Sequence, residues 1–201
     1  MNNRYMVVFV TILLIVSCKN SSSSRKYKGI DAFPNAFEAV IEIPAGTNHK
    51  IEMNKKTGDF EVDQAAGKDR IIDFLPYPGN YGFINNTLMD KNKGGDGDAL
   101  DVLILGESIP TGIHLPFIPI AVMMALDRGE KDSKIIGIPA DPNLQVMHCE
   151  NFIDFSTKYN GAKHIIKEWF MNYKGMGKME FLGWKDEKFA RNVIAKWNYV
   201  Y

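Results

Sequence analysis

The sequence has little cysteine, no excess of charge of either sign and few long apolar runs. Two of its 201 residues are cysteines, Cys18 and Cys149, which excludes a disulfide framework, and we assign Cys149 no chemistry. The 24 Lys and Arg residues balance 24 Asp and Glu residues, which excludes a basic nucleic-acid coat protein and an acidic disordered tail. We therefore expect no nucleic-acid partner. A chain of this length buries about 70% of the surface that its unfolded form exposes, enough for one globular domain.

The one conspicuous apolar run, residues 5–16, follows Arg4 and ends at Ser17 and Cys18. A charged N-terminal region, about 12 apolar residues and a small residue before the cleavage site are typical of a secretory signal peptide. The run is too short to span a bilayer comfortably. Residues 15–18, Ile-Val-Ser-Cys, resemble a bacterial lipobox, in which the cysteine is acylated. A buried N-terminal strand or helix is the alternative.

This interpretation divides the chain into three parts. Residues 1–17 would be a lipoprotein signal peptide, residues 18–29 an acylated Cys18 with a Ser-rich tether, and residues 30–201 the folded domain. The protein would then be exported and lipid-anchored to a bacterial membrane, facing the periplasm or the cell surface, and would touch the membrane only through the anchor.

Short β-branched and aromatic runs separated by turns occupy the first part of the domain. The pattern predicts strands at residues 37–43, 50–53, 82–84, 101–105, 118–124 and 134–138. After Pro142 it changes to helix, over residues 158–173 and again after Asp186, which can cap a last helix. Strands first and helices last predict a mainly β fold with some α, a β-barrel or curled sheet with helices packed outside.

Three aspartates, Asp96, Asp98 and Asp101, lead into the apolar strand at residues 101–105. At about 5 Å and an effective dielectric constant near 20, each carboxylate pair costs on the order of 3 kcal/mol, so holding them together implies a cation. Oxygen ligands favour Mg²⁺, Mn²⁺ or Ca²⁺, and the alternative is a solvated acidic loop. An EF-hand loop fits this segment poorly, because Asp101 stands where a bidentate Glu belongs. A calcium-binding β-roll turn also fits poorly, because Ala99 replaces a calcium-binding Asp.

A second charged cluster, residues 127–134, would by itself be a solvated hairpin. Elsewhere, Glu42 points away from its apolar strand neighbours, and Lys50 and Glu52 share one face of the next expected strand. Further cations and phenols are Arg70, Tyr77, Tyr81, Tyr173 and Lys174. Phosphoryl transfer requires such a combination, because metals neutralise the oxyanions, cations and phenols hold the phosphates, and a carboxylate takes the proton of the attacking water.

Taken together, these motifs resemble those of the family I soluble inorganic pyrophosphatases from about residue 37 to residue 197. The matching stretches are residues 40–45, 50–52, 77–82, 96–102, 127–134 and 173–174, in the order that the family has them. The resemblance implies a small five-stranded OB-like β-barrel with helices packed outside. It also implies Mg²⁺-dependent hydrolysis of pyrophosphate to two phosphates, with several Mg²⁺ ions, Mn²⁺ as a substitute metal, and a homo-oligomer.

The resemblance also assigns roles to individual residues. Asp98 would be the general base acting on a metal-bridged water. The carboxylates that would bind metal are Glu42, Glu52, Asp96, Asp101, Asp127 and Asp132, the central ion lying among Asp96, Asp101 and Asp132. The side chains that would hold pyrophosphate or the departing phosphate are Lys50, Arg70, Tyr81, Lys134, Tyr173 and Lys174, and Tyr77 would line the site.

Besides the expected signal peptide, which is the largest departure from a mostly cytoplasmic family, the sequence departs from the family pattern in three places. Ala99 stands where Pro or Glu is usual, and Arg128 follows Asp127 where a second acid is common. Residues 64–69 lengthen the segment before Tyr77, which makes Lys68 a rival of Arg70 as the phosphate contact.

Two other functions compete with the enzyme interpretation. A lipid-anchored protein could bind Ca²⁺ or a phosphorylated ligand without catalysis, but such binding would not need a base at Asp98. A hydrolase of larger phosphoanhydrides such as nucleotides would be expected to carry a Gly-x-x-x-x-Gly-Lys loop or a base-stacking platform, and the sequence offers neither near the acidic cluster.

Overall fold

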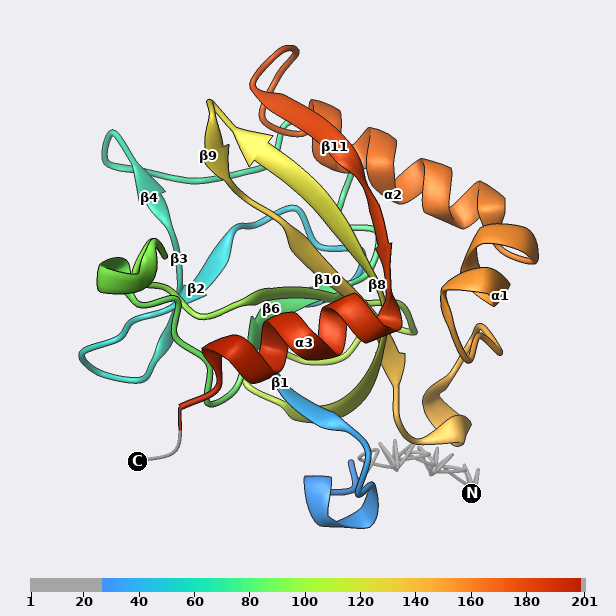
Figure 1. Ribbon diagram of the computed structural model, residues 1–201. Helices are drawn as coiled ribbons and strands as arrows, with labels where there is room; N and C mark the ends of the chain where they lie inside the picture. The colour runs from blue at the N-terminus through green and yellow to red at the C-terminus, as the bar shows by residue number, and fades with distance from the viewer. Residues whose placement is uncertain (1–26, 200–201) are drawn as a thin grey trace, which may run out of the picture.

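The computed structural model describes residues 27–199 (Figure 1). The expected signal peptide and Cys18 lie outside these residues. Within them the chain forms strands up to residue 139 and then two helices, a further strand and a last helix.

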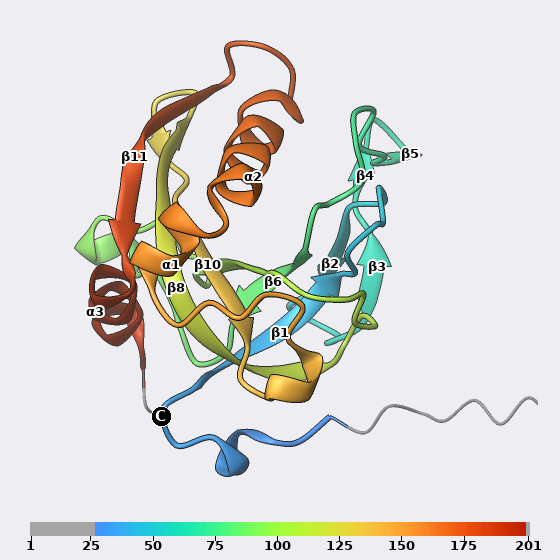
Figure 2. The same ribbon diagram turned by 90° about the vertical axis from the view of Figure 1, so that its right-hand side faces the viewer.

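Five strands close into a small barrel (Figures 1 and 2). β1 (Phe37–Ile43) pairs antiparallel with β6 (Asn80–Ile84), and β6 pairs antiparallel with β7 (Asp101–Ile104). β10 (Lys134–Pro139) lies between β7, to which it is parallel, and the long β8 (His114–Asp127), to which it is antiparallel. β8 also pairs with β1, which closes the ring. The expected five-stranded barrel is confirmed.

The other elements extend or cover this barrel. β11 (Met179–Asp186) lengthens the sheet beyond β8. The short strands are β2 (Ile51–Met53), β3 (Phe60–Val62), β4 (Gln64–Ala65), β5 (Lys68–Asp69) and β9 (Glu130–Lys131). The helices are α1 (Phe152–Thr157), α2 (Asn160–Asn172) and α3 (Glu187–Trp197), and single 3₁₀ turns are η1 (Ile30–Ala32), η2 (Lys91–Lys93) and η3 (Pro142–Leu144). In Figure 2, α2 and the hairpin β4–β5 stand on opposite sides of one end of the barrel.

Two apolar clusters form the core and fix the helices against the barrel. Trp169 and Phe170 of α2 are buried with Leu103 and Ile136 of the barrel strands. Ala190 and Ile194 of α3 are buried in the second cluster, whose other members include residues of all five barrel strands. Asp186 accepts a hydrogen bond from the Phe189 N–H at 2.9 Å, so it caps α3 as expected. Ile165 of α2 is 63% exposed, whereas its neighbour Ile166 is buried, so the core-facing stripe of this helix is narrow.

Candidate active site

A pocket of about 470 Å³ is lined by residues of the barrel strands, of the β2–β3 hairpin and of the segment that follows α2. Of the residues expected in the site, all except Asp96 line it: Glu42, Lys50, Glu52, Arg70, Tyr77, Tyr81, Asp98, Asp101, Asp127, Asp132, Lys134, Tyr173 and Lys174. These side chains are far apart in the sequence and come together because the barrel strands end at this mouth.

Glu42 reaches the pocket from a β-bulge. In the pairing of β1 with β6, Ile41 lies opposite Gly82 and Ile43 opposite Tyr81, so Glu42 is the extra residue on β1. Its Oε1 accepts a hydrogen bond from the Met53 N–H at 2.9 Å. Burial raises the pKa of Glu42 to about 7, and nearby Asp101 adds to this rise. A cation close to Glu42 would oppose this rise by favouring the ionised carboxylate.

Lys134 lines the pocket and lies between two of its acids, Asp101 and Asp132. Its side chain is 2% exposed, and its ammonium forms ion pairs with Asp101 and Asp132. Burial opposes the charge of this ammonium, but the two carboxylates outweigh it and raise the pKa of Lys134 above its ordinary value. The same ammonium helps to lower the pKa of Asp132, against the opposing effect of burial. Lys134 is therefore a permanent cation.

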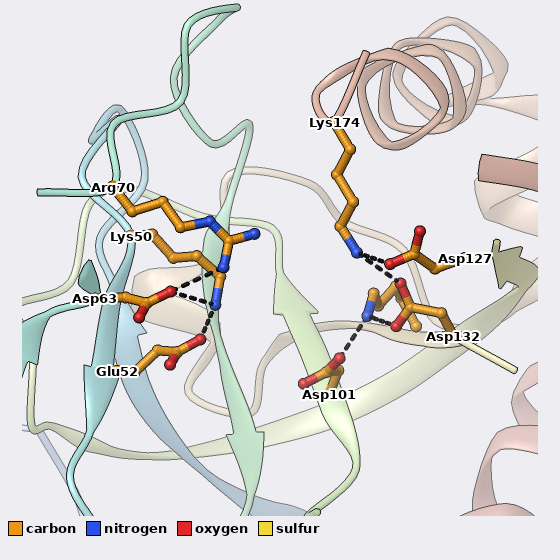
Figure 3. A network of polar contacts seen from close by, with 9 residues as sticks. Lys50, Glu52, Asp63, Arg70, Asp101, Asp127, Asp132 and Lys174 are labelled. Atoms are coloured by element: carbon orange, nitrogen blue, oxygen red, sulfur yellow. Dashed lines mark hydrogen bonds and ion pairs between the residues drawn. The ribbon is translucent and has the colours of Figure 1, made fainter. Parts of the chain in front are cut away.

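Lys174 bridges the two acids at the rim. Its Nζ lies 2.8 Å from Asp127 Oδ2 and 3.3 Å from Asp132 Oδ2 (Figure 3). The other oxygen of Asp127, Oδ1, is buried without a hydrogen-bond partner. An unpartnered buried carboxylate oxygen is costly, and a cation bound there would remove that cost.

Lys50 and Arg70 lie together on the opposite wall (Figure 3). Both pair with Asp63, at 3.7 Å from Lys50 Nζ and 2.8 Å from Arg70 Nη1, and Lys50 also pairs with Glu52. Burial and the neighbouring guanidinium of Arg70 lower the pKa of Lys50. Arg70 lines the pocket and Lys68, on β5, does not, so the geometry favours Arg70 over its rival.

The loop before β7 places Asp98 in the pocket but leaves Asp96 outside its lining. Asp96 Oδ1 accepts a hydrogen bond from the Asp98 N–H at 2.8 Å, so this oxygen shapes the turn. The Asp98 carboxylate is 62% exposed and pairs with the ammonium of Lys55, which is also a lining residue. An exposed carboxylate at the mouth can exchange protons with water.

Aromatic rings form the back of the pocket. Trp169 stacks on Tyr173 with ring centroids 4.5 Å apart, and Tyr77 lies 4.5 Å from Trp169 and 5.3 Å from Tyr81. Burial raises the pKa of both Tyr77 and Tyr81, so their phenols stay protonated and act as hydrogen-bond donors.

The donor set suits a hard divalent cation, because its pocket-lining acids offer carboxylate oxygens. Within residues 27–199, however, no three His, Cys, Asp or Glu side chains gather tightly enough to form a metal-binding group. Ammonium groups separate the acids: Lys134 stands between Asp101 and Asp132, and Lys174 between Asp127 and Asp132. The carboxylates of the pocket therefore fit the chemistry of Mg²⁺, and in this structure the ammonium groups of Lys134 and Lys174 compensate their negative charge.

Sequence reasoning missed two polar residues of this site, Lys55 and Asp63. Both depend on hairpins: Asp63 faces Arg70 across the β4–β5 turn, where the Arg70 N–H donates to the Asp63 carbonyl at 2.7 Å. The signal for Asp63 was its position at the start of that hairpin, seven residues before Arg70. Lys55 lies in the turn between β2 and β3, where charged residues are common and carry no special signal.

Comparison with known proteins gives a consistent result. A family model described as inorganic pyrophosphatase matches residues 39–201. An inorganic pyrophosphatase of Neisseria meningitidis is 36% identical over 81% of this chain and 89% of its own, and a soluble inorganic pyrophosphatase of Chlamydomonas reinhardtii is 38% identical over 74% and 70%. The crystal structure of an inorganic pyrophosphatase from Neisseria gonorrhoeae superposes with a TM-score of 0.65 at 32% identity, covering 87% of this chain and 94% of its own.

These findings contradict the exported, lipid-anchored localisation. That prediction rested on residues 1–18 alone, whereas the relatives that share the rest of the chain are inorganic pyrophosphatases, one of them named soluble. Among residues 27–199, no helix is both long and apolar enough to cross a membrane. The physical reason for the error is that one short apolar run is a weak signal, since runs of this length also occur in buried core segments. Residues 1–17 and Cys18 lie outside the described residues, so the signal peptide and the acylation stay untested.

The evidence for identity thus comes from three independent levels. The closed five-stranded barrel, the pocket of acids, cations and phenols at its mouth, and the match over residues 39–201 all agree. The chain belongs to the inorganic pyrophosphatase family, a family of hydrolases.

Proposed function

We propose that this pocket hydrolyses inorganic pyrophosphate to two phosphates with Mg²⁺ bound by its carboxylates and Asp98 as general base. The observation that carries the proposal is the division of the pocket into two walls. Asp101, Asp127 and Asp132 lie on one side with Lys174, and Lys50 and Arg70 lie on the other (Figure 3). Lys134 belongs to the acidic side, because it forms ion pairs with Asp101 and Asp132. A doubly charged cation and a multiply charged anion fit between such walls.

Inorganic pyrophosphatases generally use Mg²⁺. We assign the ions to five carboxylates of the pocket lining, Glu42, Glu52, Asp101, Asp127 and Asp132, and to Asp96, which lies outside the lining in the loop before β7. The buried, unpartnered Asp127 Oδ1 and the raised pKa of Glu42 support this assignment, because both groups gain from a nearby cation. When bound, Mg²⁺ neutralises phosphate charge and lowers the pKa of water, and Mn²⁺, which accepts the same ligands, would substitute.

The substrate contacts are Lys50, Arg70, Tyr77, Tyr81, Lys134, Tyr173 and Lys174. A guanidinium can bind a phosphate through two parallel hydrogen bonds, and protonated phenols donate to phosphate oxygens. Lys134 stays charged at neutral pH, since its pKa lies above the ordinary lysine value. The spectator phosphate is thereby held while the other phosphorus reacts.

Asp98 takes the proton of the attacking water. The water oxygen forms a bond to one phosphorus, the bond from that phosphorus to the bridging oxygen breaks, and the departing phosphate receives a proton in return. Its exposure at the mouth lets Asp98 lose that proton to solvent, and its pair with Lys55 orients the carboxylate. Proton transfer of this kind contributes about 10²–10⁴-fold to a rate.

Phosphate release from pyrophosphate tests the proposal, measured on the purified protein with Mg²⁺, with Mn²⁺ and with a chelator. We expect turnover with either metal and none with the chelator. No turnover with Mg²⁺ and Mn²⁺ alike would exclude the enzyme activity and leave the binding-protein interpretation.

Asp98→Asn tests the general base separately from binding. We expect kcat to fall by at least about 10²-fold with KM for pyrophosphate little changed, because the amide cannot accept the proton. Asp31→Asn, in η1 and far from the pocket lining, is the matched control. A kcat for Asp98→Asn within threefold of the control would assign the base to another residue.

We also propose that the folded unit is residues 30–201 and that it assembles as a homo-oligomer. The family match from residue 39 and the position of η1 at Ile30–Ala32 support the boundary. Exposed apolar side chains after β5, Ile71, Phe74 and Leu75, support the assembly, since contiguous apolar surface usually meets a partner. Size-exclusion chromatography with light scattering measures the molecular mass of the protein in solution. A monomer at micromolar concentration would contradict the assembly.

A further inference from the structure

A second pocket of about 460 Å³ lies beside the first, at the rim formed by the end of β8 and the segment after α2. The two pockets share Arg70, Asp127, Tyr173 and Lys174. A ligand that fills the first pocket can therefore extend into the second without leaving the protein surface.

The charge of the second pocket differs from that of the first. Its lining has four cations, Arg70, Arg128, Lys174 and Lys178, against two acids, Asp73 and Asp127. Lys174 and Arg70 already pair with acids, at 2.8 Å in each case. Arg128 and Lys178 form no ion pair with any residue in the described range 27–199. Among the described residues, the pocket thus holds two cations, Arg128 and Lys178, that form no ion pair.

The backbone fixes these two cations as neighbours. The Arg128 N–H donates to the Lys178 carbonyl at 2.9 Å, joining the β8–β9 turn to the segment before β11. Arg128 has φ of 51°, a left-handed conformation that is uncommon for a residue with a side chain.

We propose that this Arg128 pocket binds a phosphate group outside the reacting pyrophosphate unit; the inference rests on the proposed function of the first pocket. The ligand class is an inorganic phosphate anion. It reaches the pocket either as the third phosphate of tripolyphosphate, whose other two occupy the first pocket, or as a separate phosphate ion. Guanidinium and ammonium groups without carboxylate partners are suited to bind it, since no internal ion pair has to be broken.

The lining favours an inorganic ligand over a nucleotide. Its apolar members are the aliphatic Ile71 and Ile72, and its aromatic ring, Tyr173, is already stacked on Trp169. A nucleobase needs a free aromatic face on which to stack, and the lining offers none.

The test is the double variant Arg128→Ser/Lys178→Ser, compared with Lys188→Ser/Lys196→Ser, which removes the same charge from exposed positions on α3. Tripolyphosphate is titrated as an inhibitor of pyrophosphate hydrolysis. We expect its inhibition constant to rise about tenfold in the first variant and less than twofold in the control, since charge-assisted hydrogen bonds to two cations are lost. KM for pyrophosphate should change less than twofold in both variants, because pyrophosphate fits in the first pocket.

The mode of inhibition shows whether the phosphate group in the Arg128 pocket belongs to tripolyphosphate or is a separate phosphate ion. Tripolyphosphate that spans both pockets competes with pyrophosphate. A separate phosphate ion in the Arg128 pocket instead inhibits without competing, and that inhibition by phosphate weakens in the Arg128→Ser/Lys178→Ser variant. Either pattern supports the proposal. Equal constants for wild type, double variant and control, for both anions, would overturn it.

Calorimetric binding of tripolyphosphate in the presence of chelator keeps this inference separate from the proposed function. If the wild type hydrolyses no pyrophosphate, the proposed function fails, but weaker binding of tripolyphosphate to the double variant than to the control still supports the pocket. If hydrolysis is normal and binding is the same in both variants, only the Arg128 pocket is excluded.

Discussion

Glu42 shows how a single residue of the site opposes the stability of the fold. Burial raises the pKa of Glu42 to about 7, from 4.5 in an exposed carboxyl. In metal-free protein the folded state therefore holds a proton that the unfolded state has already lost between pH 4.5 and 7. Stability must fall as the pH rises through this range, because ionising a buried carboxyl costs free energy.

Glu42→Gln should remove this cost. We expect the metal-free variant to unfold at the same denaturant concentration as wild type near pH 4.5, and to be more stable at pH 8 by up to about 3 kcal/mol. Urea unfolding at the two pH values, with chelator present, measures the difference. Glu130→Gln, exposed on β9, is the control. A variant less stable than wild type at pH 8 would show that Glu42 is stabilising when ionised.

The same residue marks the limit of sequence reasoning at this scale. Strand alternation correctly predicted that Glu42 faces away from Ile41 and Ile43, which are buried. Alternation did not predict the bulge, because an extra residue in β1 is defined by its pairing with β6. Lys55 and Asp63 were missed for a similar reason. Turns place Lys55 in the pocket lining and Asp63 beside Arg70, and the residues of a turn follow no periodic pattern that the sequence could reveal.

At the scale of elements, Gly82 is needed where β6 passes β1 at the bulge. A Cβ at this position would lie 1.9 Å from the Val40 carbonyl oxygen and 3.1 Å from the Glu42 N. Gly82→Ala must therefore separate two barrel strands and displace Glu42. We expect a loss of about 3 kcal/mol or more in stability, seen as a fall in Tm of about 6 °C or more.

Gly161→Ala is the matched control. Gly161 lies in α2, and a Cβ there would meet nothing within 4 Å. Because alanine favours the helix over glycine, we expect this variant to gain up to about 1 kcal/mol. Thermal unfolding of both variants should move in opposite directions; a fall of similar size in both would mean that the strand contact is not the cause.

Elements with a strong local pattern were predicted well. The expected strand at residues 37–43 is β1. The expected strand at 82–84 is the C-terminal part of the longer β6, and that at 118–124 is the central part of the longer β8. β11 was missed because its residues alternate with charges and a glycine, and it forms only by pairing with β8. α1 is too short, at six residues, for a helical period to show in the sequence.

At the scale of the whole molecule, the acids of the pocket belong to distant parts of the barrel. Glu42 comes from β1, Asp101 from β7 and Asp127 from β8, and each strand is held in the ring by its neighbours. The sequence predicted that these acids would meet, through the order of motifs and the closed barrel. It did not predict that Lys134 and Lys174 would stand between them, since side-chain pairing across the pocket depends on the final packing.

Mg²⁺ binding should therefore stabilise the entire fold. An ion that joins acids from separate strands binds the folded state alone, and at 100 times its dissociation constant it contributes about 2.7 kcal/mol. We expect Tm to rise by about 5 °C or more when Mg²⁺ is added to chelator-treated protein, and to rise far less in Asp101→Asn. K⁺ at equal ionic strength controls for screening, and Asp31→Asn controls for the loss of one carboxylate. If Mg²⁺ raised the Tm of Asp101→Asn as much as that of wild type, the stabilising ion would be bound without Asp101, and the pocket would not hold the metals as proposed.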